Sequence, residues 1–186
     1  MSNMAPTHSY FIEDISTFHQ NLELEGAILA AVGIMQNDLP HRSVFFSLEC
    51  QNIISQKLDT EEDTQLQIQW QADTELRSKN LLRTYQRNRI IEDAALAISC
   101  ILFPKVVPSG LSVALYGDRA DYWTDDDRFL VEISGTENPK VFRQRHRRKV
   151  KQLLSNPYGK GGFVVVCDFL KQRILFSFHS GGSVNE

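Results

Sequence analysis

The chain has 186 residues, of which 42% are hydrophobic and 23% are charged, and its formal net charge is -3. This length suits one domain with a substantial core, and the composition is that of a globular protein rather than a disordered or fibrous one. The slightly acidic balance excludes a generally basic protein that coats nucleic acid, so any nucleic-acid surface must be local.

The N-terminal part of the chain predicts helices followed by a β-hairpin. In residues 11–35, apolar side chains recur mostly at intervals of three and four, which is typical of one or two amphipathic helices divided at Gly26. Residues 43–48 and 65–72 carry strand signals, and the second segment alternates apolar residues with glutamine. The acidic connection at residues 59–63 indicates that these two strands pair as a hairpin.

The middle of the chain predicts one long helix and three short strands. An apolar face recurs through residues 75–103, and Pro104 should stop this helix because proline cannot donate the next backbone hydrogen bond. Strand candidates follow at residues 111–116, 119–124 and 128–134. They are close enough in sequence to form an antiparallel meander.

The last part predicts a helix and two strands. Asn138 can cap a helix in which Pro139 takes the first position, and the helix should run to about Leu154. A continuous apolar strand at residues 163–169 should be buried on both faces, and a final strand covers residues 173–179. The inner face of the helix is expected to carry Phe142, His146, Val150, Leu153 and Leu154.

This order of elements predicts an α+β or mixed α/β fold, with a mixed central β-sheet flanked by helices. A helix between two strands of one sheet implies a parallel, right-handed crossover. We expect a single compact unit in which residues 1–74, a helical segment plus a hairpin, pack on a core of residues 75–186. The N-terminal segment would offer a surface for a homodimer or a protein partner.

Two short polar segments flank the acidic hairpin before the last helix. Ala120-Asp121 precedes the hairpin, and Glu132-Ile133-Ser134 follows it. The period of two along a strand places residues 132 and 134 on one face, beside Asp121 on the neighbouring strand. Two carboxylates placed in this way can hold Mg²⁺ or Mn²⁺, since hard cations prefer oxygen ligands. An acid within an apolar strand is costly without such an ion or a partner.

This arrangement resembles the PD-(D/E)xK superfamily of phosphodiesterases, in which an acidic pair lies on adjacent strands after a helix. The resemblance covers the chain from about residue 75 to residue 179. It implies a restriction-endonuclease-like core, a Mg²⁺ or Mn²⁺ ion held by Asp121 and Glu132, and an assisting helical carboxylate at Glu92. In this family the ion polarises a phosphodiester and activates a water molecule.

The chain departs from the family pattern at Ser134, where the pattern has lysine. A lysine supplies a positive charge that orients the water and stabilises the developing charge on the phosphate, which a hydroxyl group alone cannot do. Members of the superfamily can carry this lysine on a neighbouring element. Lys149 and Lys140 on the following helix are the candidates, and their spacing does not choose between them. Ser134 would line the site.

Residues 140–151 form a local basic cluster in a chain that is acidic overall. Arg145, Arg148 and Lys149 are expected to hold phosphates of DNA, because such cations neutralise the backbone and position the strand. The alternative is a solvated face paired with the acids of residues 125–127. His146 falls on the apolar row of the helix, which favours a packed, hydrogen-bonded histidine.

Aromatic and cysteine residues add little to this picture. Tyr122, Trp123 and Trp70 could stack on bases, although aromatics in strands are more often part of the core. The three cysteines form no CxxC pair and are expected to be reduced. No apolar run reaches the length of about 18 residues that a membrane span needs, and no signal peptide pattern is present, so a cytoplasmic protein without a membrane partner is expected.

Two functions stay open from the sequence. The first is a divalent-metal-dependent endonuclease that hydrolyses phosphodiester bonds of DNA. The second is a catalytically inactive nuclease-fold protein that serves as a DNA-binding or protein-interaction module, with Ser134 as the trace of a lost activity.

Overall fold

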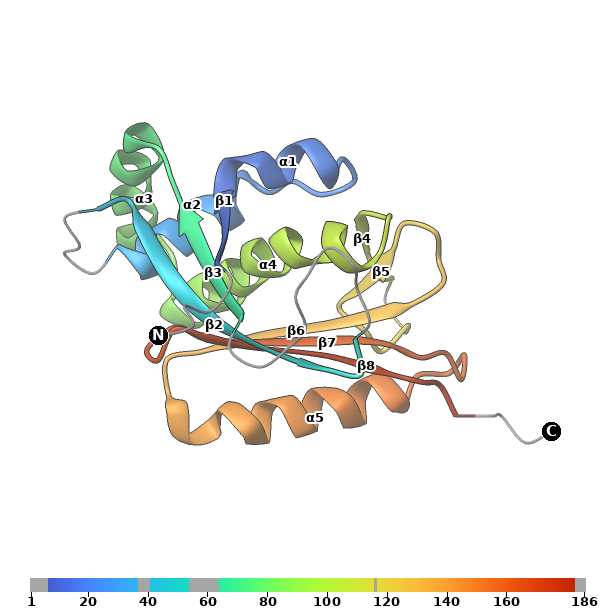
Figure 1. Cartoon of the computed structure of the whole chain (residues 1–186). Coiled ribbons are helices and arrows are strands. Elements are labelled where there is room, and N and C mark those ends of the chain that lie inside the picture. The colour runs from blue at the N-terminus through green and yellow to red at the C-terminus, as the bar shows by residue number, and fades with distance from the viewer. Residues whose placement is uncertain (1–6, 37–40, 54–63, 116, 183–186) are drawn as a thin grey trace.

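The computed structural model describes residues 7–36, 41–53, 64–115 and 117–182. Within these ranges the strands form one mixed sheet in the order β1-β3-β2-β8-β7-β6-β5-β4 (Figure 1). The strands are β1 (Thr7–Phe11), β2 (Ser43–Gln51), β3 (Thr64–Gln69), β4 (Leu111–Val113), β5 (Tyr122–Thr124), β6 (Leu130–Thr136), β7 (Gly162–Asp168) and β8 (Arg173–His179). The helices are α1 (Ile15–Phe18), α2 (Glu25–Met35), α3 (Ala72–Thr84), α4 (Arg87–Val106) and α5 (Phe142–Leu154).

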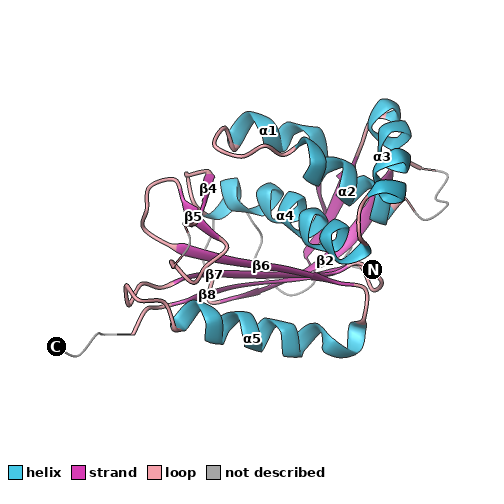
Figure 2. Ribbon diagram, turned by 180° about the vertical axis from the view of Figure 1, so that it is seen from behind, coloured by secondary structure: helices cyan, strands magenta, loops and turns pink. Residues whose placement is uncertain are grey.

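Helices cover both faces of the central strands, which confirms the predicted α+β class with a mixed sheet. Figure 2 shows α5 along one face of β6, β7 and β8 and α4 across the other. Beneath α5, Leu130, Phe142 and Leu153 belong to a small buried apolar cluster. A larger apolar cluster fills the space around α4 and α2 on the opposite face. The central strands are therefore buried from both sides.

The C-terminal half has the predicted topology. β6 and β7 are parallel and joined through α5, while β4, β5 and β6 form the antiparallel meander. Every residue of β7 is buried, as its continuous apolar sequence predicts. Asn138 caps the start of the helical segment, since its Oδ1 accepts a hydrogen bond from the backbone N–H of Lys140. Leu154, expected on the inner face, is instead 47% exposed.

The N-terminal strands extend the same sheet rather than forming a separate layer. β2 and β3 pair in antiparallel fashion, which confirms the predicted hairpin, whereas its connection at residues 59–63 lies outside the described residues. β2 also pairs in parallel with β8, and β1 pairs in parallel with β3. The expectation that a helix begins at Phe11 was wrong, because this residue ends β1.

The break between α1 and α2 lies at residues 19–24, before the predicted position at Gly26. The buried side chain of His19 fixes this connection: its Nε2 donates to the Cys100 carbonyl at 2.9 Å, and its Nδ1 accepts from the Leu111 N–H at 3.1 Å. The chain is thus held against α4 and β4 at this point. Gly26 lies inside the first turn of α2.

The long helix expected at residues 75–103 is two helices. α3 ends at Thr84, and Tyr85 is extended with φ −107° and ψ 153°. α4 then continues through Pro104 to Val106, so Pro104 does not stop it. Proline cannot bond the carbonyl four residues earlier, that of Cys100, and His19 bonds this carbonyl instead. A contact with a residue distant in the sequence thereby replaces the backbone hydrogen bond that Pro104 cannot make.

The cysteines are free thiols: Cys100 and Cys167 are buried, and Cys50 is partly buried. None of the helices in the described ranges combines the length and the apolar character needed to cross a membrane.

Candidate active site

The candidate site lies where β5 separates from β6. The two strands pair only at Tyr122 with Val131 and at Trp123 with Leu130. Beyond Val131, the backbone amides at the edge of β6 donate hydrogen bonds to side chains instead of to a neighbouring strand. The N–H of Ile133 donates to Asp121 Oδ2 at 2.9 Å, and the N–H of Gly135 donates to a carboxylate of α4 at 3.2 Å. The sheet edge therefore gathers carboxylates, because its amides need acceptors.

A lysine of α5 bridges the two acids that the sequence singled out. Glu132 lies on the face of β6 that α5 covers and has 0% exposure. Lys149 Nζ donates to Asp121 Oδ2 and to Glu132 Oε2, both at 2.7 Å. The Lys149 side chain is itself only 18% exposed. Of the two lysines that spacing left open, Lys149 reaches the acids, whereas Lys140 is exposed.

Asp121, Glu132 and Lys149 are here called the triad, and a second group of polar side chains lies beside it. The Ser134 hydroxyl donates to Glu92 Oε1 at 3.3 Å, and Arg145 Nη1 donates to the same oxygen at 3.2 Å and to Ser134 Oγ at 3.1 Å. Glu92 Oε2 accepts the bond from Gly135. Arg145 precedes Lys149 by one helical turn, so both cations lie on one side of α5. Arg148 takes part in neither group and is exposed.

Gly135 explains how the α4 carboxylate comes so near to β6. A Cβ atom at this position would lie 2.4 Å from the Ile91 carbonyl oxygen and 2.7 Å from its Cγ2. Only glycine allows α4 to approach the strand so closely, which brings Glu92 to the strand edge. The contact between α4 and β6 was not predicted from the sequence, where its one signal is a glycine within an apolar strand.

Burial and charge shift the pKa values of the site. Burial raises the pKa of Glu132 to about 8, and the Asp121 carboxylate acts in the same direction against the opposing charge of Lys149. Burial alone would lower the pKa of Lys149, but Asp121 and Glu132 outweigh burial and raise it. Burial also raises the pKa of Glu92, against the Gly135 amide and the nearby cations. Glu132 is thus the acid whose ionisation costs most.

The donor set suits a hard divalent cation. Glu132 Oε1 is buried and has no hydrogen-bond partner within the described structure, and such an atom is costly unless a proton or an ion satisfies it. Among the described residues, no three or more His, Cys, Asp or Glu side chains are grouped to hold a metal. Mg²⁺ is commonly held by one or two carboxylates and several waters, and Asp121 and Glu132 are the two carboxylates that would hold it here.

A cavity of about 320 Å³ gives Asp121 and Lys149 access to solvent, whereas Glu132 is fully buried and is not among its lining residues. Side chains from α4, β5, β6 and α5 meet there, so a substrate could reach Asp121, Glu92 and Lys149 from outside. The lining residues are Glu92, Asp93, Leu96, Asp121, Tyr122, Ile133 and Lys149.

His146 lies away from the site and is packed and hydrogen-bonded, as its position on the apolar row predicted. Its Nε2 lies 2.7 Å from Ser177 Oγ, and this hydroxyl lies 2.9 Å from His179 Nε2. Burial, followed by the charge of His179, lowers the pKa of His146 to about 4.

We expect His146 to lower the free energy of unfolding as the pH becomes acidic. Because its folded-state pKa lies below its ordinary value of 6.5, its contribution is complete above about pH 6.5 and is lost as the pH falls towards 4. Urea unfolding between pH 7 and 4 should show that His146→Gln loses on the order of 2 kcal/mol less stability than the wild type. The matched variant His41→Gln, at an exposed position, should follow the wild type; equal losses in both variants would contradict the prediction.

No family model, no curated protein and no solved structure matches the chain. The chemistry of the site is therefore the basis for a functional proposal.

Proposed function

We propose that this protein is a PD-(D/E)xK-like, divalent-metal-dependent endonuclease that hydrolyses phosphodiester bonds of DNA. One observation carries the proposal: Lys149 Nζ lies 2.7 Å from carboxylates of Asp121 and Glu132, which come from adjacent segments of the sheet. Two acids and one lysine in contact are the groups that the PD-(D/E)xK pattern requires. The lysine comes from α5 instead of position 134, and the surrounding α+β core would be restriction-endonuclease-like.

Each side chain of the site has a chemical task in this proposal. Asp121 and Glu132 would hold Mg²⁺ or Mn²⁺, which when bound supplies a polarised phosphodiester and a more acidic water. The Lys149 ammonium group orients the attacking water and offsets the negative charge that develops on the phosphate. As the water oxygen bonds to phosphorus and gives up a proton to solvent, the P–O bond to the leaving sugar oxygen breaks and this oxygen takes a proton from solvent. Glu92 would assist as an additional carboxylate at the same cavity, held in place by Ser134 and Arg145.

The exposed side of α5 supplies cations for the DNA backbone. Arg147, Arg148 and Lys151, here called the basic face of α5, are exposed and lie within one helical turn of each other. Within the described part of the chain, none of the three forms a salt bridge with an acidic side chain. The sequence predicted that Arg145, Arg148 and Lys149 hold phosphates. Arg145 and Lys149 instead contact acids of the site, so only Arg148 of these three is exposed.

The proposal is tested by titrating Mg²⁺ and Mn²⁺ into the protein with plasmid and linear DNA. Wild type should cleave both, and Asp121→Asn should lose cleavage by at least about 100-fold, because the amide binds the ion weakly and no longer balances Lys149. Asp73→Asn, the same change at an exposed aspartate of α3, should cleave as the wild type does. Cleavage that survives Asp121→Asn would rule out this mechanism.

The basic face of α5 gives a separate prediction for binding. Replacing Arg147, Arg148 and Lys151 together by alanine should weaken DNA binding and reduce the slope of log K against log salt by roughly 2 to 3, close to one per phosphate contact. Fluorescence anisotropy between low and moderate salt measures this slope. The control changes Arg77, Lys79 and Arg83 of α3 to alanine and should leave the slope as it is. Equal slopes in the wild type and the α5 variant would exclude this surface.

One observation also favours the second candidate, a nuclease-fold protein that binds DNA or a protein without cleaving. Lys149 already donates to both acids, and with Glu132 protonated below its pKa of about 8, the charges of Asp121 and Lys149 balance without an ion. DNA binding that requires the basic face of α5, with no cleavage in Mg²⁺ or Mn²⁺, would select this candidate.

A further inference from the structure

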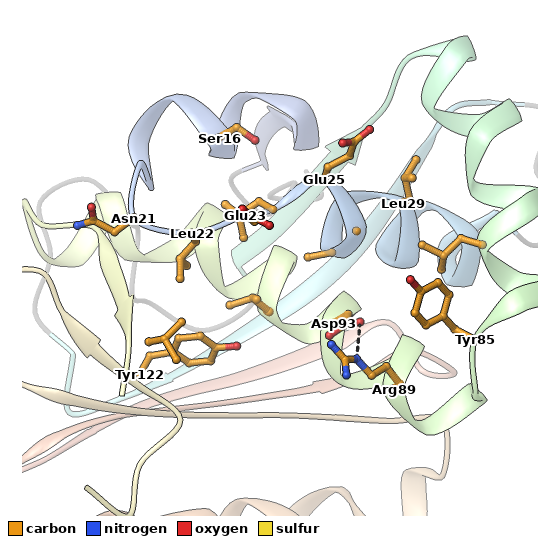
Figure 3. Close-up of a pocket in the computed structure, with 16 residues that line it drawn as sticks. Ser16, Asn21, Leu22, Glu23, Glu25, Leu29, Tyr85, Arg89, Asp93 and Tyr122 are labelled. Carbon is orange, nitrogen blue, oxygen red and sulfur yellow. Dashed lines mark hydrogen bonds and ion pairs between the residues drawn. The ribbon is translucent and has the colours of Figure 1, made fainter. Parts of the chain in front are cut away.

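A larger cavity, of about 1030 Å³, adjoins the candidate active site. Asp93, Leu96 and Tyr122 line both cavities, so the large cavity adjoins the smaller one, which Asp121 and Lys149 line. Figure 3 shows it between the segment that leads into α2 and the helix α4, with Tyr122 and Tyr85 at opposite ends. A substrate strand at the triad would therefore have this space beside its scissile phosphate.

The charges of the large cavity do not suit phosphate groups. Its lining includes the carboxylates Glu23, Glu25 and Asp93 and a single guanidinium, that of Arg89. Arg89 is paired with Asp93, and Glu25 with Arg77. A phosphate placed here would meet surplus negative charge, whereas the basic face of α5 carries exposed cations. The two surfaces thus favour different parts of a nucleotide.

Bases match the cavity where phosphates do not. Bases are uncharged and flat, and tyrosine rings such as those of Tyr122 and Tyr85 offer stacking surfaces for any base. The amino groups of adenine, cytosine and guanine are donors for carboxylate acceptors such as Glu23 and Asp93. Apolar side chains, Leu22 among them, complete the lining.

We infer that this cavity receives unpaired bases next to the scissile phosphate, so that the substrate is single-stranded or locally unpaired DNA rather than uninterrupted duplex. The inference rests on the proposed nuclease function and deepens it by naming the substrate class. In a duplex the bases must first leave the stack, which costs free energy that a single strand does not require. The wild type is therefore expected to cleave a single strand about tenfold or more faster than a blunt duplex of the same sequence.

Gly26 offers a position from which a larger side chain can fill the cavity. It lines the cavity, and a Cβ atom built there meets nothing within 4 Å. Gly26→Trp would place an indole in the space meant for bases. The matched control is Gly182→Trp, because a Cβ at Gly182 also meets nothing within 4 Å and this residue lies outside the cavity lining. Tyr122→Leu, which removes the aromatic ring that lines both cavities, is a second variant in case Gly26→Trp folds poorly.

The test measures kcat/KM in Mg²⁺ for a labelled single strand, a blunt duplex and a duplex with a central bulge. In wild type and Gly182→Trp the single strand and the bulge should be preferred, and in Gly26→Trp and Tyr122→Leu the preference should fall about tenfold. Equal cleavage of all three substrates by the wild type, or an unchanged preference in both cavity variants, would overturn the inference while the nuclease function stands. Absence of cleavage of every substrate in Mg²⁺ and Mn²⁺ would overturn both.

Discussion

Replacing Lys149 by methionine should abolish DNA cleavage, with a loss of about 100- to 1000-fold, and should also destabilise the fold. The methionine keeps the aliphatic stem beneath α5 but removes the ammonium group that lies between Asp121 and Glu132. Two neighbouring carboxylates would then lack their cation. Breaking a buried ion pair from one side costs about 3 kcal/mol, and the cost should be largest at pH 9, above the Glu132 pKa of about 8, and smaller at pH 5, where Glu132 is protonated in both proteins.

Cleavage assays, and urea unfolding at pH 9 and pH 5, measure the two effects. Lys171→Met, the same change at an exposed position, should affect neither. The double variant Lys149→Met with Glu132→Gln should regain much of the stability at pH 9, since the fully buried charge of Glu132 is gone and only the partly exposed Asp121 stays unpaired, yet remain unable to cleave. Full cleavage by Lys149→Met would show that the triad is a structural ion cluster and not a catalytic one.

Local sequence patterns were sufficient for the C-terminal half of the fold. The apolar run of β7 and the Asn138 cap are local signals, and the parallel crossover through α5 follows from chirality. The N-terminal region depends on distant partners instead. β1 is a strand because it pairs with β3, more than fifty residues later, and the apolar spacing around Phe11 fits a helix equally well.

Some features of the candidate site also follow from the local sequence, whereas others depend on how distant elements pack. The period of two placed Glu132 and Ser134 on one face from the sequence alone. The choice of Lys149 over Lys140 could not be made, because it depends on which side of α5 meets β6. The contact of Glu92 with the edge of β6 depends on the close approach of α4 at Gly135, which only the packed structure shows.

Glu132→Gln should act on stability in the opposite direction to Lys149→Met while causing a cleavage loss of about 1000-fold. The amide is a weak ligand for Mg²⁺, so the loss of cleavage follows from the loss of one of two carboxylates. Stability should rise because the raised pKa of Glu132 means that burial opposes its ionisation. The protonated carboxyl contributes fully below about pH 4.5, and this contribution is lost as the pH rises through about 8.

Because glutamine cannot ionise, Glu132→Gln should be more stable than the wild type by about 2 kcal/mol at pH 9 and equally stable at pH 4.5. Urea unfolding across this range gives the difference, and Mg²⁺ titration calorimetry at pH 7 should show a heat of binding for the wild type only. Glu137→Gln, at a surface glutamate paired with Arg87, serves as the matched control. If the two unfolding curves stay parallel from pH 4.5 to pH 9, Glu132 does not carry a raised pKa. In that case Lys149 alone offsets its burial under α5, and the unpartnered Oε1 would be all that favours a metal ion at the site.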